Sequence, residues 1–328
     1  MRRRLTILLA LVLVVVVTGI ALTWIPSNYY LILPDKARPT DPLVKIPGEK
    51  AGQSNEIYMV DVRVGRASLL ERLLPPLRED GTLIPERVLN PEGVSDQQRR
   101  RSSLNDMTLS QKIAITVALR ELGREVKVTP RGAEVVLVQP GSPADGELQV
   151  GDVIVGANGE KITGTDELRQ AFAEVEPGDD VEITVDRDGK RVELTVGTLA
   201  LEGDAKRAVV GVQVQDADEF EFPVDIKINA GGIGGPSAGL AFALDIVDEL
   251  GDDIDRGRTI VATGELALDG SVHPIGGVKQ KAIGAKNAGA DIFLVPDGNY
   301  EDAKNAVEGL RVIPVSTFDE ALSVLATN

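Results

Sequence analysis

Hydrophobic residues follow three different patterns along this chain. Residues 5–25 form one uncharged apolar run, and a helix of that length rises about 30 Å, which matches the hydrocarbon thickness of a bilayer. Residues 57–64 alternate like a half-buried strand, whereas residues 107–122 repeat apolar positions at helical spacing before Gly123. From residue 208 onward, strand-like and helix-like segments alternate. The pattern therefore predicts an α+β fold that follows an N-terminal apolar helix.

The apolar run has the flanks of a transmembrane helix. Arg2–Arg4 precede it, Trp24 lies at its end, and Tyr29 and Tyr30 follow it, as in the aromatic belts at membrane interfaces. The positive-inside rule places the N-terminus in the cytoplasm and the body of the chain outside it. A cleaved signal peptide is the alternative, but the run is long for one and no small-x-small cleavage site follows it. We expect residues 1–25 to be an uncleaved, single-pass anchor in the cell membrane.

Two polar stretches are expected to lack regular structure. Residues 26–55 are rich in Pro, Gly and charge, and we expect a linker or edge segment there. The stretch 78–105 is also polar, and its basic run Arg99–Arg101 is expected to lie in a solvated loop.

Residues 125–200 contain the pattern of a small β-rich module. A strand at 134–138 leads into PGSPAD and VGDVIVGANG, a helix follows at 165–175, and two strands flank the turn Asp188-Gly189. These motifs resemble a PDZ domain of the bacterial type. The resemblance implies that the module takes an extended peptide, often a C-terminus, as an added strand beside its helix.

The peptide groove of this module is expected between the strand near Val126 and Val128 and the helix residues Leu168 and Phe172. No GLGF-like carboxylate loop marks the groove. Leu168 and Phe172 are therefore explained equally well as ordinary core residues.

Composition removes several kinds of site. The net charge of −16 argues against DNA or RNA as a partner, because phosphate binding needs a basic face. The absence of cysteine excludes disulfides and a thiolate nucleophile, and the one histidine, His273, cannot form a histidine-rich metal site. We expect no metal and no cofactor. Asp225, Asp245 and Asp248 are expected to be solvated or to cap helices.

Ser237 stands where a glycine-rich segment meets a predicted helix. Four glycines and a proline fill most of residues 231–236, and glycines permit sharp turns and close approach of another chain. A helix N-terminus adds unpaired amides. The amides of Gly234, Gly235 and Ser237 could therefore hold an oxyanion, with Ser237 as the nucleophile. A plain N-cap role for Ser237 explains the same pattern.

Lys281 lies on a helix expected to begin at Val278. At about 100° per residue, Val278, Ala282 and Ala285 form an apolar stripe with Lys281 on its flank, whereas Lys279 falls on the opposite side. A lysine among apolar atoms has a lowered pKa and can act as a base near neutral pH. Lys281 could then take the proton of the serine hydroxyl, as in Ser-Lys dyads. The alternative is a lysine whose amine reaches solvent from the edge of the stripe.

The segments GGPSAGLAFAL and TGELALDGSVHPIGGVKQK closely resemble the proteolytic domain of the Lon proteases. The resemblance implies that Ser237 is the nucleophile, that Lys281 rather than Lys279 is the base, and that the Thr263 hydroxyl orients the lysine amine. It also places residues 56–124 and 201–328 in one Lon-type proteolytic domain, with the PDZ-like module inserted between them. The whole arrangement is similar to bacterial membrane-anchored PDZ and Lon-like proteases.

Two features depart from the Lon pattern. Lon proteases usually carry an acidic residue three positions before the serine, where this chain has Gly234, so a carboxylate role there is lost. No GxxxxGK[ST] phosphate loop occurs in the chain. We therefore expect an ATP-independent serine endopeptidase that cleaves flexible or unfolded polypeptides.

Other interpretations remain open at this point. The chain could be a catalytically silent Lon-like and PDZ adaptor scaffold at the membrane, although it retains the serine, the threonine and both lysines together. His273 could in principle serve Ser237, but it occupies the variable position of the G-x-V-x-P turn. A hexamer is expected by resemblance alone, because Lon-like domains commonly assemble into rings.

Overall fold

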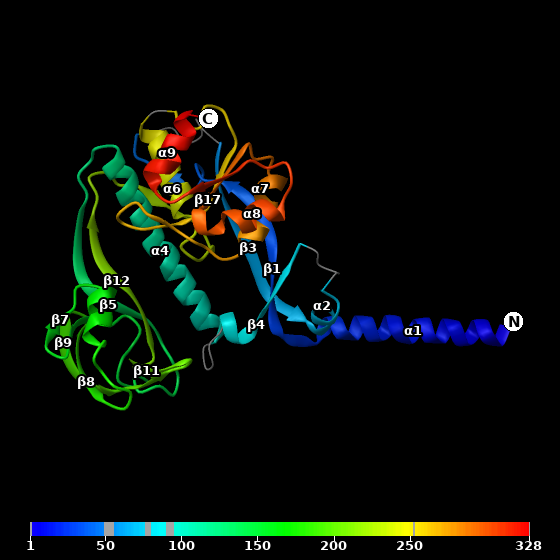
Figure 1. Ribbon diagram of the computed structural model, residues 1–328, viewed down its shortest axis with the longest axis horizontal. Coiled ribbons are helices and arrows are strands. Elements are labelled where there is room, and N and C mark those ends of the chain that lie inside the picture. Colours follow the sequence, from blue (N-terminus) through cyan, green and yellow to red (C-terminus); the bar gives the residue numbers. More distant parts are fainter. Residues whose placement is uncertain (1, 49–55, 76–79, 90–94, 252, 328) are drawn as a thin grey trace. The chain divides into compact units, whose positions relative to one another are not determined.

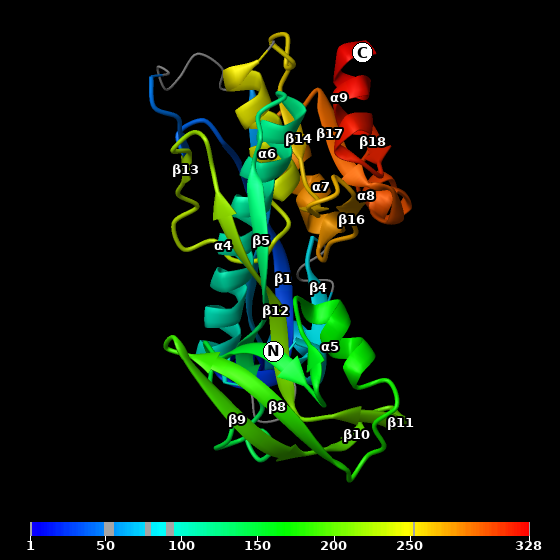
Figure 2. The same cartoon turned by 90° about the vertical axis from the view of Figure 1, so that its left-hand side faces the viewer.

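The computed structural model describes residues 2–48, 56–75, 80–89, 95–251 and 253–327. The chain divides into two compact units, and their elements are labelled in Figure 1 and, from a second direction, in Figure 2. Unit 1 comprises Met1–Pro91 and Ser237–Asn328, and unit 2 comprises Glu92–Pro236. The chain therefore leaves unit 1, completes unit 2 and returns to unit 1.

Unit 1 is built on a mixed six-stranded sheet with the order β18-β17-β14-β3-β1-β4. The long strands β1 and β3 pair antiparallel, while β14 pairs in parallel with β3 and β17. Segments from both ends of the chain thus share one sheet. The strands are β1 (Pro26–Pro39), β3 (Ile57–Ser68), β4 (Thr82–Pro85), β14 (Ile260–Ala262), β17 (Ile292–Pro296) and β18 (Val312–Val315), and the short strands β2 (Val44–Lys45), β15 (Glu265–Leu266) and β16 (Val272–His273) lie outside this sheet.

Several helices of unit 1 pack against this sheet. Helix α6 packs against β3 and β14, and its residues from Gly239 to Val247 are buried. Helix α7 packs against β1 and β3 and shares a buried cluster with Val261, Phe293 and Val295. The helices are α1 (Arg2–Trp24), α2 (Leu69–Leu73), α3 (Glu86–Leu89), α6 (Gly239–Leu250), α7 (Val278–Asn287), α8 (Tyr300–Ala306) and α9 (Phe318–Thr327), with the 3-10 turn η2 at Asp297–Asn299.

Helix α1 contains the apolar run. Its segment Thr6–Trp24 is long and apolar enough to cross a membrane, and none of it is buried within the protein. An anchor and a signal sequence both satisfy these two observations.

The prediction of a linker at 26–55 is wrong for its first half. Residues Pro26–Pro39 form β1, which lies between β3 and β4 inside the main sheet. Tyr30, Leu31 and Ile32 are all buried there, because the strand is covered on both faces and therefore does not alternate. The part of the prediction that covers 49–55 lies outside the described residues.

Unit 2 joins a long helix to the PDZ-type sheet. The sheet has the order β12-β5-β6-β8-β9, with β7 paired to β6, and one hydrophobic core lies against it. The turn Asp188-Gly189 has φ values of 52° and 76°, as a tight hairpin turn requires. The elements are α4 (Asp96–Glu121), α5 (Thr165–Ala171), β5 (Lys127–Val138), β6 (Val153–Ala157), β7 (Glu160–Lys161), β8 (Asp180–Arg187), β9 (Lys190–Gly197), β10 (Leu199–Leu201), β11 (Asp204–Val209), β12 (Val212–Glu221) and β13 (Lys227–Ile228).

Two boundaries in unit 2 differ from the predictions. The helix expected from residue 107 begins at Asp96, so the basic run Arg99–Arg101 is helical rather than in a loop. Ser95 and Gln98 form a capping box at its start, and that local signal outweighs the low hydrophobicity of the first turns. Strand β12 pairs with β5, so the chain remains in the PDZ-type sheet well past the boundary expected at residue 201.

The close packing of α7 on the sheet gives a first testable prediction. A Cβ on Gly284 would lie 2.6 Å from the Asp35 carbonyl oxygen and 2.9 Å from Val60 Cγ2. Gly284→Ala should therefore push α7 off the strands and lower the free energy of unfolding by about 1–3 kcal/mol. Thermal unfolding of the full chain in detergent measures the effect. A Cβ on Gly276 meets nothing within 4 Å, so Gly276→Ala is the matched control, and equal unfolding temperatures for the two variants would contradict the prediction.

Candidate active site

Three side chains of unit 1 meet at one point. Lys281 Nζ lies 2.6 Å from Ser237 Oγ and 3.0 Å from Thr263 Oγ1. The Thr263 hydroxyl donates to the Ser237 carbonyl at 3.1 Å. Because the Thr263 hydroxyl donates its proton to a carbonyl, its oxygen can accept a hydrogen bond from an N–H of the lysine amine. The geometry therefore joins a hydroxyl, an amine and an orienting hydroxyl in one hydrogen-bonded group.

Each of the three side chains is positioned by a different element. Lys281 lies in the first turn of α7, and Thr263 follows directly after β14. Ser237 lies two residues before α6, whose N-cap is Ala238. The expectation that Ser237 opens the helix is therefore corrected, and the hydrogen bond that its hydroxyl makes with a described residue is the one with Lys281. The Ser237 hydroxyl points to Lys281 instead of to a helix amide.

The amine of Lys281 is removed from solvent. The residue is 2% exposed, and this desolvation lowers its pKa to about 8, against a smaller opposing effect of Asp61. Val278, Ala282 and Ala285 are buried beside it, as the helical stripe predicts. Lys279 behaves oppositely: its side chain is 56% exposed and forms an ion pair with Asp302 at 3.3 Å.

Asp61 is a charged neighbour that no sequence pattern singled out. It lies on β3, where burial raises the pKa of its carboxyl group while Arg38 and Lys281 lower it. Arg38 forms an ion pair with it at 3.7 Å. Only the pairing of β1 with β3, which is a nonlocal contact, brings Arg38 to this carboxylate.

The amides expected to form an oxyanion hole differ from one another. The Gly235 N–H donates to the Ser103 carbonyl at 2.7 Å, so it is already occupied, which corrects its expected role. Within the described part of the chain, the amides of Gly234 and Ser237 have no acceptor. A free amide at the nucleophile is the group that a developing oxyanion requires.

Helix α4 holds the glycine-rich segment in unit 2. Besides the Ser103 contact, the Ser110 hydroxyl donates to the Pro236 carbonyl at 2.8 Å. Ser110 is buried, and Pro236 directly precedes Ser237. No sequence pattern indicates these contacts, because they join residues more than a hundred positions apart.

The structure places the predicted PDZ groove residues on different elements of unit 2. Leu168 lies in the hydrophobic core of this unit and Phe172 packs against that core, as the alternative interpretation expects, and the groove stays a prediction. Val126 lies before β5, and Val128 pairs with Phe220 near the far end of β12. The start of α5 instead meets β12 at Asp216, which accepts a hydrogen bond from the Thr165 amide at 2.7 Å.

His273 and the acidic residues have other contacts. The His273 ring contacts Ser271 Oγ at 3.2 Å, and Ser271 also donates to Asp269. Asp225 is solvated and forms an ion pair with Lys227. Asp245 was expected to be solvated or capping, but it is buried, accepts a hydrogen bond from Thr40 at 2.6 Å and has a pKa raised by burial to about 8.

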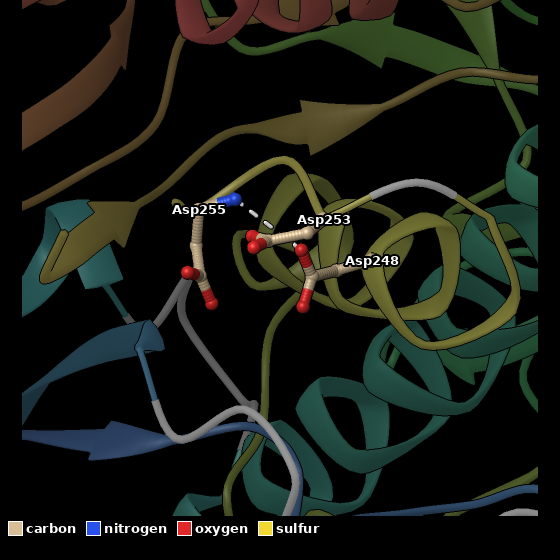
Figure 3. A group of neighbouring side chains, drawn as sticks. All are labelled: Asp248, Asp253 and Asp255. Atoms are coloured by element: carbon tan, nitrogen blue, oxygen red, sulfur yellow. Dashed lines mark hydrogen bonds between the residues drawn. The ribbon is translucent and has the colours of Figure 1, made fainter. Parts of the chain in front are cut away.

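Asp248, in the last turn of α6, lies close to Asp253 and Asp255, which follow the helix (Figure 3). Asp248 accepts from the amides of Ile254 and Asp255. Asp253 and Asp255 likewise accept from amides of the same turn. The three carboxylates therefore act as caps for this turn.

Two known protein domains match separate parts of the chain. A PDZ domain matches residues 115–198, and the Lon protease (S16) C-terminal proteolytic domain matches residues 205–328. The chain contains a PDZ domain and a Lon-type proteolytic domain. The Lon-type domain includes Ser237, Thr263 and Lys281.

Relatives of the Lon-type domain occur in several bacteria. Lon protease of Rickettsia bellii is 39% identical over 124 residues, which are 36% of this chain and 16% of that protein. Lon protease 2 of Bacillus subtilis is 39% identical over 120 residues, 36% of this chain and 21% of that protein. Lon protease of Azorhizobium caulinodans is 29% identical over 282 residues, 84% of this chain and 30% of that protein. The chain therefore spans less than a third of the length of each of these relatives.

The packing of α4 predicts that the acid missing before the serine cannot be restored. A Cβ on Gly234 would lie 2.4 Å from Ser103 Oγ and 3.0 Å from the Ser103 carbonyl oxygen. Gly234→Asp should displace the segment that leads to Ser237, and a shift of about 1 Å can lower a rate about 100-fold. Cleavage of an unfolded protein substrate measures the loss. The control is Gly231→Asn, because a Cβ there meets nothing within 4 Å and asparagine tolerates its φ of +63°. Higher activity in Gly234→Asp would contradict the packing argument.

Proposed function

We propose that this protein is an ATP-independent, membrane-anchored serine endopeptidase with Ser237 as nucleophile and Lys281 as general base. The observation that carries the proposal is the 2.6 Å contact between a buried lysine amine and a serine hydroxyl. The match of this region to a Lon proteolytic domain supports it independently.

The chemistry follows from the protonation states. With a pKa of about 8, roughly a tenth of the Lys281 amine is unprotonated at pH 7. The free amine takes the proton of Ser237 as its Oγ attacks the scissile carbonyl carbon. The Ser237 amide stabilises the resulting oxyanion. Lys281 then passes the proton to the leaving amine, and it activates the water that hydrolyses the acyl-enzyme.

Thr263 has an orienting role in this scheme. Its hydroxyl donates to the Ser237 carbonyl and accepts from the Lys281 amine. Occupying one N–H of the amine in this way turns the nitrogen lone pair toward Ser237 Oγ. Thr263 therefore positions the Lys281 amine and does not itself react.

The remaining parts of the chain suggest how substrates are chosen. The PDZ domain would select polypeptides through an added strand. Helix α1 would hold the enzyme in the cell membrane, with the N-terminus inside and the catalytic part outside. Because the sequence contains no phosphate-binding loop, the substrates would be flexible or already unfolded.

Substitution of the two lysines tests the assignment of the base. Ser237→Ala and Lys281→Ala should each lower cleavage of an unfolded protein at least about 1,000-fold, since the members of such a group act as a unit. Lys279→Ala removes only an exposed ion pair and should retain most activity. Labelling of Ser237 by a fluorophosphonate gives a second measurement. Equal losses at the two lysines would contradict the assignment, and an unlabelled wild-type protein would favour the silent scaffold.

The lowered pKa of Lys281 sets the expected pH dependence. Since the unprotonated amine is the active form, kcat/KM should rise about tenfold between pH 7 and pH 9 and then level off. A lysine with the usual pKa near 10.4 would give a rate still rising at pH 10. Rates on an unfolded substrate from pH 6 to pH 10.5 distinguish the two cases. A flat profile across this range would exclude a lysine base.

A further inference from the structure

The N-terminal helix is joined to the catalytic sheet without a flexible connection. Helix α1 ends at Trp24, and β1 begins at Pro26 (Figure 1). The Leu69 amide donates to the Ile25 carbonyl at 2.8 Å, and the Ser27 hydroxyl donates to the Ala67 carbonyl at 2.8 Å. The end of the helix is thus tied to the same strands that build the site.

A second set of contacts fixes this junction. The Arg72 guanidinium donates to Asn28 Oδ1 at 2.7 Å and lies 4.9 Å from the centre of the Tyr29 ring. Arg66 lies over the Tyr30 ring and forms an ion pair with Glu86. These contacts hold the start of β1 against β3 and α2, and α2 in turn packs against α1.

Apolar side chains are exposed where α1 meets the sheet. Helix α2 packs against α1, and Trp24 is 82% exposed, Leu73 59% and Leu74 50%. Tryptophan and leucine beside arginine are the side chains that settle into a membrane interface. Because this surface continues the apolar surface of α1, a lipid bilayer can bury both. Binding of the bilayer would then keep the start of β1 at the membrane surface.

Strand β1 leads directly from this junction to the catalytic lysine. Two residues of β1 contact α7. Ile32 Cγ2 lies 3.7 Å from the position that a Cβ on Gly277 would take, and the Asp35 carbonyl oxygen lies 2.6 Å from that position on Gly284. Lys281 falls between these two glycines on α7. At about 3.3 Å per residue, Ile32 and Asp35 are roughly 20 and 30 Å along the strand from Pro26. Adding one helix diameter of about 10 Å places the dyad within about 40 Å of the junction, whatever the tilt of the strand.

We propose that this fixed distance restricts the enzyme to peptide bonds close to the membrane surface. The substrates are flexible segments within about 40 Å of the bilayer, which an extended chain crosses in about 12 residues. This inference rests on the proposed peptidase activity and membrane anchorage, and it adds a substrate class to them. The rigid junction, rather than sequence preference, sets this limit.

The test uses proteoliposomes that contain the full-length protein and a membrane-anchored reporter. The reporter carries an unfolded casein segment either directly after its own anchor or beyond a helical spacer of about 40 residues, which rises about 60 Å. The wild-type enzyme should cleave the near segment at least tenfold faster than the far one. Equal rates for the two reporters would overturn the proposal.

The control variant keeps the anchor and removes the fixed distance. A flexible Gly/Ser insert of about 40 residues between Ile25 and Pro26 adds roughly 35 Å of root-mean-square reach, so this variant should cleave both reporters within about threefold of each other. It must also cleave the soluble casein segment at the wild-type rate, which shows that its catalytic domain folds. A retained preference for the near reporter would refute the role of the junction. Failure of the wild-type enzyme on soluble casein would refute the peptidase activity itself, and failure to enter liposomes would refute the anchorage.

Discussion

The contact between the Lys281 amine and the Ser237 hydroxyl depends on the removal of water from one charged group. Moving an ammonium group into a protein interior destabilises its charged form. At Lys281 this desolvation lowers the pKa of the amine, so that the amine loses its proton more easily. The amine is shielded from water by the apolar stripe of α7 and by the buried strands beneath that helix. The Thr263 hydroxyl orients it toward Ser237. A lysine at the same position with access to water would keep its proton near neutral pH.

This arrangement requires segments from both ends of the chain. Strands β1 and β3 precede the PDZ domain, whereas β14, β17, α6 and α7 follow it. Val60 of β3 packs in one cluster with Val278 and Ala282 of α7, so the lysine-bearing helix depends on a strand more than two hundred residues earlier. Such nonlocal packing is slow to form, but a continuous sheet then makes the site rigid. Unit 2, whose sequence lies between these two sets of segments, has its own hydrophobic core.

Sequence reasoning succeeded where local periodicity carries the information. The outward position of Lys279 and the buried stripe beside Lys281 follow from 3.6-residue spacing alone, and the α+β fold with its PDZ and Lon-type motifs is confirmed. It failed where tertiary contacts decide. In β1, Pro34 and Pro39 made an internal strand look like a linker. The pairing of β1 with β3 has an irregularity between Pro34 and Ala37, where the strand accommodates a proline. The contacts of Ser103 and Ser110 with the glycine-rich segment have no local signal at all.

That glycine-rich segment shows how a departure from a family pattern can be structural. Glycine residues give the backbone conformational freedom, but at Gly234 the lack of a Cβ lets the Ser103 main chain approach. The neighbouring Gly235 amide and the Pro236 carbonyl are then both bound by α4. Three consecutive residues before the nucleophile are thereby held by one helix, so the entropy that glycines usually cost is recovered through packing and hydrogen bonds. The absence of an acid at residue 234 thus matches the close packing of α4, because any side chain there would meet Ser103.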